Sequence, residues 1–171
     1  MHPLHPQSTA DAGAQAPPPR IGRLRAFTAR RLNPAEKALA RGIFGDSLPY
    51  ERIRLVQLPR LTFGAAVPFG RTIFFSRWRC PADFTGASLR EQAWFIHELA
   101  HLWQARRGVP LMLAKLFALG KRAYRIPPNK PFSHMNIEAQ AETARLLFLA
   151  RAGAAEPDCP LNAVELEMCW R

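Results

Sequence analysis

The sequence predicts a single α+β domain in which a short sheet packs on helices. The length of 171 residues suits one domain, since a chain of roughly 150 residues buries about 68–70% of the surface that its unfolded form exposes. Hydrophobic residues make up 48% of the chain, which excludes a sequence too polar to collapse. Two strand-like runs lie among several helix-like runs, and together they predict the mixed architecture.

Residues 1–27 are predicted to be a disordered, proline-rich and basic tail, followed by a folded domain at 28–155 and a C-terminal extension at 156–171. The first twenty residues contain no apolar h-region, so no Sec signal peptide is evident. We therefore expect a cytoplasmic location, with non-classical export as the alternative. No apolar run reaches the roughly 18 residues that a transmembrane segment needs.

The chain carries a formal net charge of +11, and five arginines between Arg20 and Arg31 precede the first glutamate. Nucleic acid, an anionic membrane surface or an acidic protein would be attracted to this basic arm. A solvated arm without a dedicated partner is the favoured interpretation. Nucleic acid is therefore a partner that the sequence allows but does not favour.

The first helix is predicted at residues 34–43. Asn33 and Pro34 are typical of the N-cap and first helical positions, and Glu36 stands at the third position of the first turn. Gly45 is suited to end the helix.

Two strands are predicted next, at residues 51–58 and 71–76. The first places Ile53, Leu55 and Leu58 near one face, and the second is rich in β-branched and aromatic residues. Both runs are flanked by proline and glycine turns, so they indicate a small sheet.

Three further helices are predicted. Ser88 and Glu91 form a capping box ahead of apolar residues at helical spacing, which predicts a helix at 89–107. Residues 110–120 begin with proline and end with glycine, so we expect a short buried helix, with a membrane-surface helix as the alternative. The segment from Ser133 carries an apolar stripe typical of another long helix.

The helix at 89–107 contains the pattern H-E-x-x-H, formed by His97, Glu98 and His101. Residues four apart lie on one helical face, so both imidazoles can bind one Zn²⁺ while Glu98 lies at the edge of the same site. A zinc ion acidifies its bound water, and an adjacent glutamate can accept the proton as general base. The pattern therefore predicts zinc-dependent hydrolysis, whereas two core histidines bonded to carbonyl groups are the structural alternative.

A catalytic zinc site needs a third protein ligand. Glu138 and Glu142 lie four apart on the last long helix. If that helix packs against the H-E-x-x-H helix, Glu138 can bind the metal while Glu142 accepts a hydrogen bond from a ligand histidine, although the two roles could be exchanged. Pairing of these glutamates with Arg145 or solvent is the structural alternative, and His134 is a rival third ligand.

Peptide hydrolysis also needs a group that stabilises the oxyanion. Tyr124 and His134 flank the proline-rich loop between the two metal-binding helices, so either side chain could contact the oxyanion or substrate. A half-buried structural role is the favoured alternative for Tyr124.

Three cysteines, Cys80, Cys159 and Cys169, form neither a C-x-x-C pair nor an even disulfide framework. Reduced thiols are therefore expected. Cys159 and Cys169 are close enough in sequence to pair in an oxidising compartment, but their spacing alone does not establish a bond.

These motifs carry a family resemblance. The H-E-L-A-H pattern at 97–101 with Glu138 and Glu142 downstream resembles the gluzincin branch of the zincin metallopeptidases. Residues 32–46, the strand at 52–56 and HELAHLWQ at 97–104 resemble the small bacterial vgr-related proteins. They are also similar to the metallopeptidase core domain found with extracellular contractile injection systems, and the resemblance covers about residues 28–150.

The resemblance implies a small zincin-like domain, with zinc bound by His97, His101 and Glu138 and with Glu98 as general base. A peptide or protein is the implied substrate, and a secretion or injection system is the implied context. Two alternatives stay open. One is an inactive or weakly active zinc-stabilised module that binds a partner in a secretion or toxin system, and the other is a metalloprotease associated with nucleic acid.

Overall fold

The computed structural model describes residues 22–59, 66–76, 80–118, 120–127 and 130–170. Within these ranges the chain forms a four-stranded sheet and helices, which confirms the predicted α+β class. The described elements are, in chain order, β1 (Thr28–Arg31), α1 (Pro34–Phe44), η1 (Tyr50–Arg52), β2 (Arg54–Gln57), β3 (Ala66–Phe69), β4 (Thr72–Phe75), α2 (Leu89–Arg106), α3 (Leu111–Phe117), η2 (Lys121–Tyr124), η3 (Phe132–His134), α4 (Ile137–Arg151) and α5 (Ala163–Cys169).

The sheet has the strand order β1-β2-β4-β3. The β1 and β2 strands are antiparallel, β2 and β4 are parallel, and β3 and β4 form an antiparallel hairpin. The hairpin turn contains Gly70 at a φ of +60°, in the left-handed region that glycine adopts without a steric penalty. Leu55 pairs with Ile73 at the centre of the sheet, and both side chains are fully buried.

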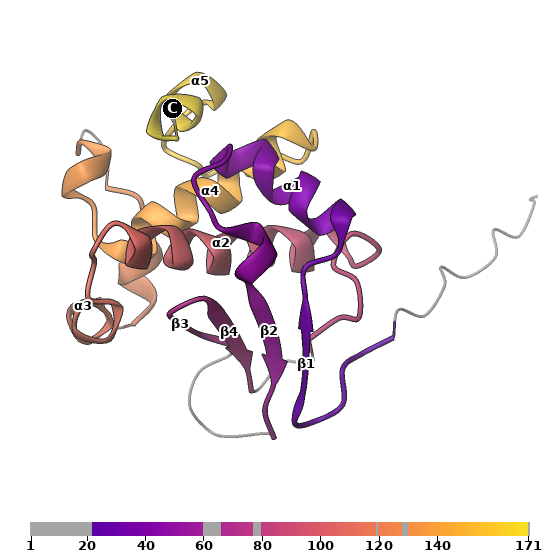
Figure 1. Cartoon of the computed structure of the whole chain (residues 1–171). Helices are drawn as coiled ribbons and strands as arrows, with labels where there is room; N and C mark the ends of the chain where they lie inside the picture. Colours follow the sequence, from indigo (N-terminus) through magenta and orange to yellow (C-terminus); the bar gives the residue numbers. More distant parts are fainter. Residues whose placement is uncertain (1–21, 60–65, 77–79, 119, 128–129, 171) are drawn as a thin grey trace, which may run out of the picture.

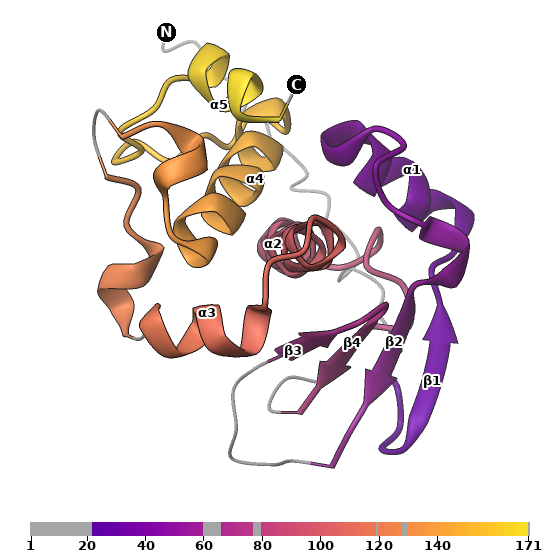
Figure 2. The same ribbon diagram turned by 60° about the vertical axis from the view of Figure 1, so that its left-hand side comes forward.

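Helix α2 lies in the middle of the molecule. The sheet packs along one side of it, and α1 and α4 cover other sides (Figures 1 and 2). Phe84 stacks on Phe95 of α2 with ring centroids 4.3 Å apart, and Phe75 of β4 meets Trp94 edge-on at 5.4 Å. Because neighbours surround α2, its polar residues in the middle turns are buried as well, and these include the H-E-x-x-H pattern.

The predicted long helices are confirmed with small shifts at their ends. Asn33 and Ser88 cap α1 and α2 through complete capping boxes, and α1 ends at Gly45 as expected. Helix α4 begins at Ile137 because Asn136 accepts a hydrogen bond from the Ala139 amide, so Ser133 belongs to η3 rather than to the helix.

The sheet differs from the prediction at its edges. The run at 71–76 corresponds to β4, and the run at 51–58 is a strand only over β2, since its first part is η1. The sequence did not predict β1 and β3. Both are edge strands, and an edge position tolerates Pro68 in β3 because one side of an edge strand needs no ladder hydrogen bond.

The short helix at 110–120 forms as α3, but the prediction that it is buried is wrong. Met112, Leu113 and Phe117 are 64%, 59% and 90% exposed. The helix is short and lies at the periphery of the molecule beside β3, so only part of it can face the core (Figure 2). None of the helices in the described part of the chain combines the length and apolar character that crossing a bilayer requires.

The basic N-terminal segment is described only from residue 22, and residues 1–21 lie outside the described ranges. Two of its arginines form ion pairs with the folded body. Arg30 of β1 binds the fully buried Glu36 at 2.6 Å, and Arg23 lies 2.5 Å from Glu91 of α2. These two arginines therefore stabilise the folded domain, which leaves fewer positive charges of the arm to bind an external polyanion.

The C-terminal segment after α4 packs back on the helices. Leu166 of α5 is buried, and the Trp170 indole donates a hydrogen bond to the Thr143 hydroxyl of α4 at 3.0 Å. The Trp170 ring also contacts rings from three other segments, namely Phe44, Trp103 and Phe132. This aromatic cluster joins α5 to α1, α2 and η3.

All three cysteines are free thiols. Cys80 is fully buried in the hydrophobic core, and burial raises the pKa of its thiol to about 12. Its side chain is therefore a neutral part of the core at physiological pH.

Candidate metal centre

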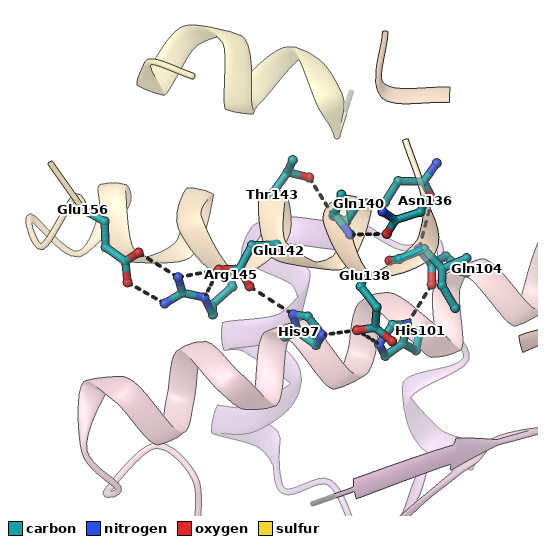
Figure 3. Close-up of polar contacts among 12 residues, drawn as sticks. His97, His101, Gln104, Asn136, Glu138, Gln140, Glu142, Thr143, Arg145 and Glu156 are labelled. Carbon is teal, nitrogen blue, oxygen red and sulfur yellow. Dashed lines mark hydrogen bonds and ion pairs between the residues drawn. The ribbon is translucent and has the colours of Figure 1, made fainter. Parts of the chain in front are cut away.

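The two histidines of the H-E-x-x-H pattern lie one turn apart on α2 and face α4. Their ring centroids are 5.0 Å apart and the ring planes are nearly perpendicular. The Nε2 atoms of His97 and His101 each lie 3.2 Å from the same oxygen of Glu138 (Figure 3). All three residues are buried, with exposures of 4% or less.

The His97–His101–Glu138 group can hold a metal ion, since one potential donor atom from each residue lies within 4.8 Å of the others. The structure brings Glu138, and not the rival candidate His134, to the two histidines. His134 lies exposed on η3 and does not line the cleft described below.

A glutamine determines how His101 faces this group. The side-chain amide of Gln104 donates hydrogen bonds to the Ile137 carbonyl and to Oε1 of Gln140, so its own oxygen points to Nδ1 of His101, 2.8 Å away. Nδ1 of a neutral His101 must therefore carry the proton, which leaves a lone pair on Nε2. That lone pair faces a carboxylate oxygen, an arrangement that a cation between them would stabilise.

The hydrogen-bond inventory supports the same conclusion. Among the described residues, His101 Nε2 and Glu98 Oε2 are the buried side-chain polar atoms without a hydrogen-bond partner. The 3.2 Å approach of His101 Nε2 to Glu138 meets the distance of an ion pair but not the geometry of a hydrogen bond. Buried polar atoms rarely lack partners, so these two atoms fit a site that receives a metal and a water or substrate.

A chain of ion pairs supports His97 from the other side. Nδ1 of His97 lies 3.4 Å from Glu142, and Glu142 accepts two hydrogen bonds from Arg145, which also binds Glu156 at 2.7 Å (Figure 3). Glu142 therefore makes both contacts that the sequence offered as alternatives, one with a histidine and one with Arg145. A carboxylate on Nδ1 orients the ring so that Nε2 faces the metal position.

The charges of this group influence one another strongly when no cation is present. Burial disfavours the charged form of His97, but hydrogen bonds with Glu138 and Glu142 outweigh it and raise its pKa to about 9. Burial also opposes ionisation of Glu138, yet its contacts with His101 and His97 hold the pKa of this carboxyl well below its ordinary value. The protein thus compensates a buried carboxylate with positive charge, which a divalent cation would supply directly.

The group opens on one side to a cleft of about 1020 Å³. Glu98 lines this cleft together with His97, Glu138 and Glu142, so the predicted general base faces the same space as the candidate ligands. Tyr124 also lines it, and its ring stacks on His97 with centroids 5.8 Å apart. Burial and the neighbouring carboxylates Glu138 and Glu98 raise the pKa of Tyr124 to about 12.

Tyr124 is about half exposed in the cleft wall, which agrees with the half-buried position that the sequence favoured and also leaves part of its side chain open to the cleft. The sequence considerations did not identify Gln104 as a positioning residue. Its place three residues after His101, on the same helical face, was the available indication.

The chain is similar to part of a bacterial type VI secretion system protein. No protein family model matches the chain. Over 133 residues, or 71% of the chain, it is 36% identical to the type VI secretion system spike protein VgrG2b of Pseudomonas aeruginosa, but it spans only 13% of that protein's length. It also resembles the solved structure of the effector domain of P. aeruginosa VgrG2b, with a TM-score of 0.61 and 28% identity over 86% of this chain and 84% of that one.

Proposed function

We propose that this chain, a homologue of the VgrG2b effector domain, is a zinc-dependent metallopeptidase domain that works within a bacterial secretion system. The observation that carries the proposal is the buried His97–His101–Glu138 group beside an unbonded Glu98 in an open cleft. Two imidazoles and one carboxylate are a donor set typical of catalytic zinc, which keeps its remaining position for water or substrate.

Different residues of the chain have different roles in the proposed hydrolysis. A bound Zn²⁺ supplies Lewis-acid polarisation of a carbonyl and acidification of water. Glu98 accepts the proton from the attacking water and returns it to the leaving amine, because it lines the cleft and its buried Oε2 forms no competing hydrogen bond among the described residues. Gln104 and Glu142 keep the two histidines in the required orientation.

Tyr124 is the residue to which we assign hydrogen-bond donation to a developing oxyanion. It lies in the cleft wall beside His97, and its raised pKa keeps the phenol protonated at neutral pH. A neutral phenol can donate a hydrogen bond to negative charge that forms on a substrate oxygen. His134 lies outside the cleft, which supports no such role for it.

The first test is the metal content of the purified protein, measured by elemental analysis beside Glu138→Ala and Glu142→Ala. We expect about one zinc per wild-type chain, loss of zinc in Glu138→Ala, and a smaller loss in Glu142→Ala because that residue acts only through His97. A protein that binds no metal in any form would contradict the proposal.

The second test separates metal binding from catalysis. Glu98→Gln is nearly isosteric and leaves the three ligands intact, so it should keep its zinc and lose hydrolysis of unfolded protein substrates. A loss of roughly 10²–10⁴-fold is expected when a general base is removed. Equal hydrolysis by wild type and Glu98→Gln would refute the role of Glu98.

The second candidate function is a zinc-stabilised module that binds a partner in a secretion system without hydrolysing peptides. The homology to a domain of a spike protein favours a secretion context for both candidates. This second candidate predicts that neither wild type nor Glu98→Gln hydrolyses peptides. It also predicts that removal of zinc by a chelator unfolds the protein.

A further inference from the structure

Helix α3 presents apolar side chains to solvent at the periphery of the molecule. Phe117 at the end of the helix is 90% exposed, and Met112 and Leu113 are more than half exposed. Phe69, at the end of the neighbouring strand β3, is 66% exposed. These four residues are called the α3 apolar patch below.

Three of the four side chains border one surface hollow, and Phe117 lies on the same helix as two of them. Phe69, Met112 and Leu113 line the same shallow hollow of about 250 Å³ between β3 and α3. Figures 1 and 2 both place α3 on the outside of the fold, away from α1 and β1. Contiguous exposed apolar surface of this kind marks an interaction site more often than scattered single residues do.

The two stretches of sequence that contribute the patch residues carry charge of one sign. Between Glu98 and Glu138 the sequence contains seven Lys or Arg residues and no Asp or Glu, and between Glu51 and Asp83 it contains six arginines and again no acid. Arg71 and Arg106 line a second hollow that shares Gly70 and Ala105 with the hollow beneath the patch, so cationic side chains directly adjoin it. Both of these arginines are exposed.

We propose that the α3 apolar patch docks on the surface of an anionic phospholipid bilayer. Apolar side chains would enter the boundary between headgroups and acyl chains, while the surrounding arginines contact the phosphates. Lys and Arg side chains near such a surface favour binding, whereas acidic side chains would oppose it, and this stretch of chain has no acidic residue.

This proposal does not depend on the proposed function, because none of the patch residues belongs to the metal centre. The two features are nevertheless neighbours. Lys115 and Ala118 of the same helical segment line the cleft that contains Glu98. Docking through α3 would therefore hold the cleft close to the bilayer surface and favour substrates that lie at a membrane.

The test is co-flotation of the full chain with lipid vesicles. Wild type should float with vesicles that contain phosphatidylglycerol and not with pure phosphatidylcholine vesicles, and added salt should weaken the binding. The double variant Leu113→Ser/Phe117→Ser should bind the anionic vesicles roughly tenfold or more weakly, because it removes two side chains that would be buried in the interface.

The matched control is Val164→Ser/Met168→Ser on α5, which replaces two side chains of 68% and 69% exposure elsewhere on the surface. This control should bind as wild type does, and both variants should keep the metal content of wild type. Absence of wild-type binding to anionic vesicles would overturn the proposal. Wild-type binding by the α3 variant would also overturn it and would assign any lipid affinity to the basic segment at 20–31.

Discussion

Gln104 shows how one neutral side chain can prepare a metal site. Its side chain is fully buried, and its NH₂ group donates hydrogen bonds to residues of α4. Its oxygen can therefore only accept a hydrogen bond from Nδ1 of His101, which determines the tautomer of that histidine. The metal-facing lone pair of His101 thus depends on a contact made on the opposite side of the ring.

Replacing Gln104 with leucine is therefore expected to weaken zinc binding about 10–100-fold, the usual cost of losing such an outer contact. Competition with a zinc-binding dye measures this affinity. Gln92→Leu is the matched control, since Gln92 also lies on α2 and bonds loop carbonyls but does not contact the histidines. Equal affinities for wild type and Gln104→Leu would show that the amide does not control His101.

The sequence predicted the parts of this site that depend on one helix. The spacing of His97 and His101 places them on one face whatever the tertiary structure. The spacing of Glu138 and Glu142 offered either of them as a third ligand, and the family resemblance selected Glu138. Gln104 was not predicted, because its partners Ile137 and Gln140 meet it only after α2 and α4 have packed. The ion pair of Arg145 with Glu156 likewise depends on the path of the chain after α4.

The strands of the sheet likewise differ in how far the local sequence predicts them. The central strands β2 and β4 carry apolar and β-branched residues that identify them in the sequence, whereas the edge strand β1 is polar and basic and the edge strand β3 contains Pro68. Strand β1 contains Arg30 and Arg31, which were assigned to a solvated basic arm. Their place in the sheet depends on the partner strand β2 and on Glu36, neither of which local spacing indicates.

Glu36 joins β1, the start of α1 and the segment before α2. Its buried carboxylate accepts hydrogen bonds from Arg30, from the Asn33 amide and from the Phe84 amide. Glu36→Gln should destabilise the protein by about 3 kcal/mol, since it leaves the partly buried Arg30 guanidinium without its fully buried counter-charge.

Chemical denaturation measures this loss, with Glu51→Gln as control. Glu51 pairs with Lys37 at an exposed position, so its replacement should destabilise the protein far less than Glu36→Gln does. Similar losses for the two variants would mean that the buried pair contributes no more than a surface pair.

Glu91 makes the first turn of α2 sensitive to acid. Burial opposes its ionisation, but hydrogen bonds from Arg23 and Ser88 outweigh burial and lower its pKa in the folded state. A lowered folded-state pKa stabilises the protein above the unfolded-state value of about 4.3, and this contribution is lost as the pH falls further. Glu91→Gln should therefore cost about 1 kcal/mol at pH 7 and progressively less as the solution becomes acidic.

Denaturation of wild type and Glu91→Gln over a series of pH values tests this expectation. Glu165→Gln is the control, because Glu165 occupies the same capping position on α5 but has no ion pair among the described residues. A difference between wild type and Glu91→Gln that stays constant from neutral to acidic pH would exclude an electrostatic origin.

At the scale of the whole molecule, the candidate metal centre connects α2 to α4, the two longest helices of the described chain. Binding of an ion to the folded state alone stabilises it, by about 4 kcal/mol when the free ion is at 1,000 times its dissociation constant. For a protein of this size, that corresponds to a rise in Tm of roughly 8–16 °C.

Thermal unfolding with a chelator and after zinc is restored measures this effect. Glu98→Gln should show the full stabilisation, since its ligands are intact, whereas His97→Ala should show little. An unchanged Tm of wild type after metal removal would indicate that the ion makes no contribution to folding.

The aromatic cluster around Trp170 has a practical consequence for protein engineering. A shortened version that stops after α4 would delete Trp170, expose Phe44 and Trp103, and remove Glu156 from Arg145. The orientation of Glu142 against His97 would then rest on Arg145 alone. The smallest fragment suitable for crystallisation or enzymology should therefore extend through Trp170, even though every candidate metal ligand precedes residue 139.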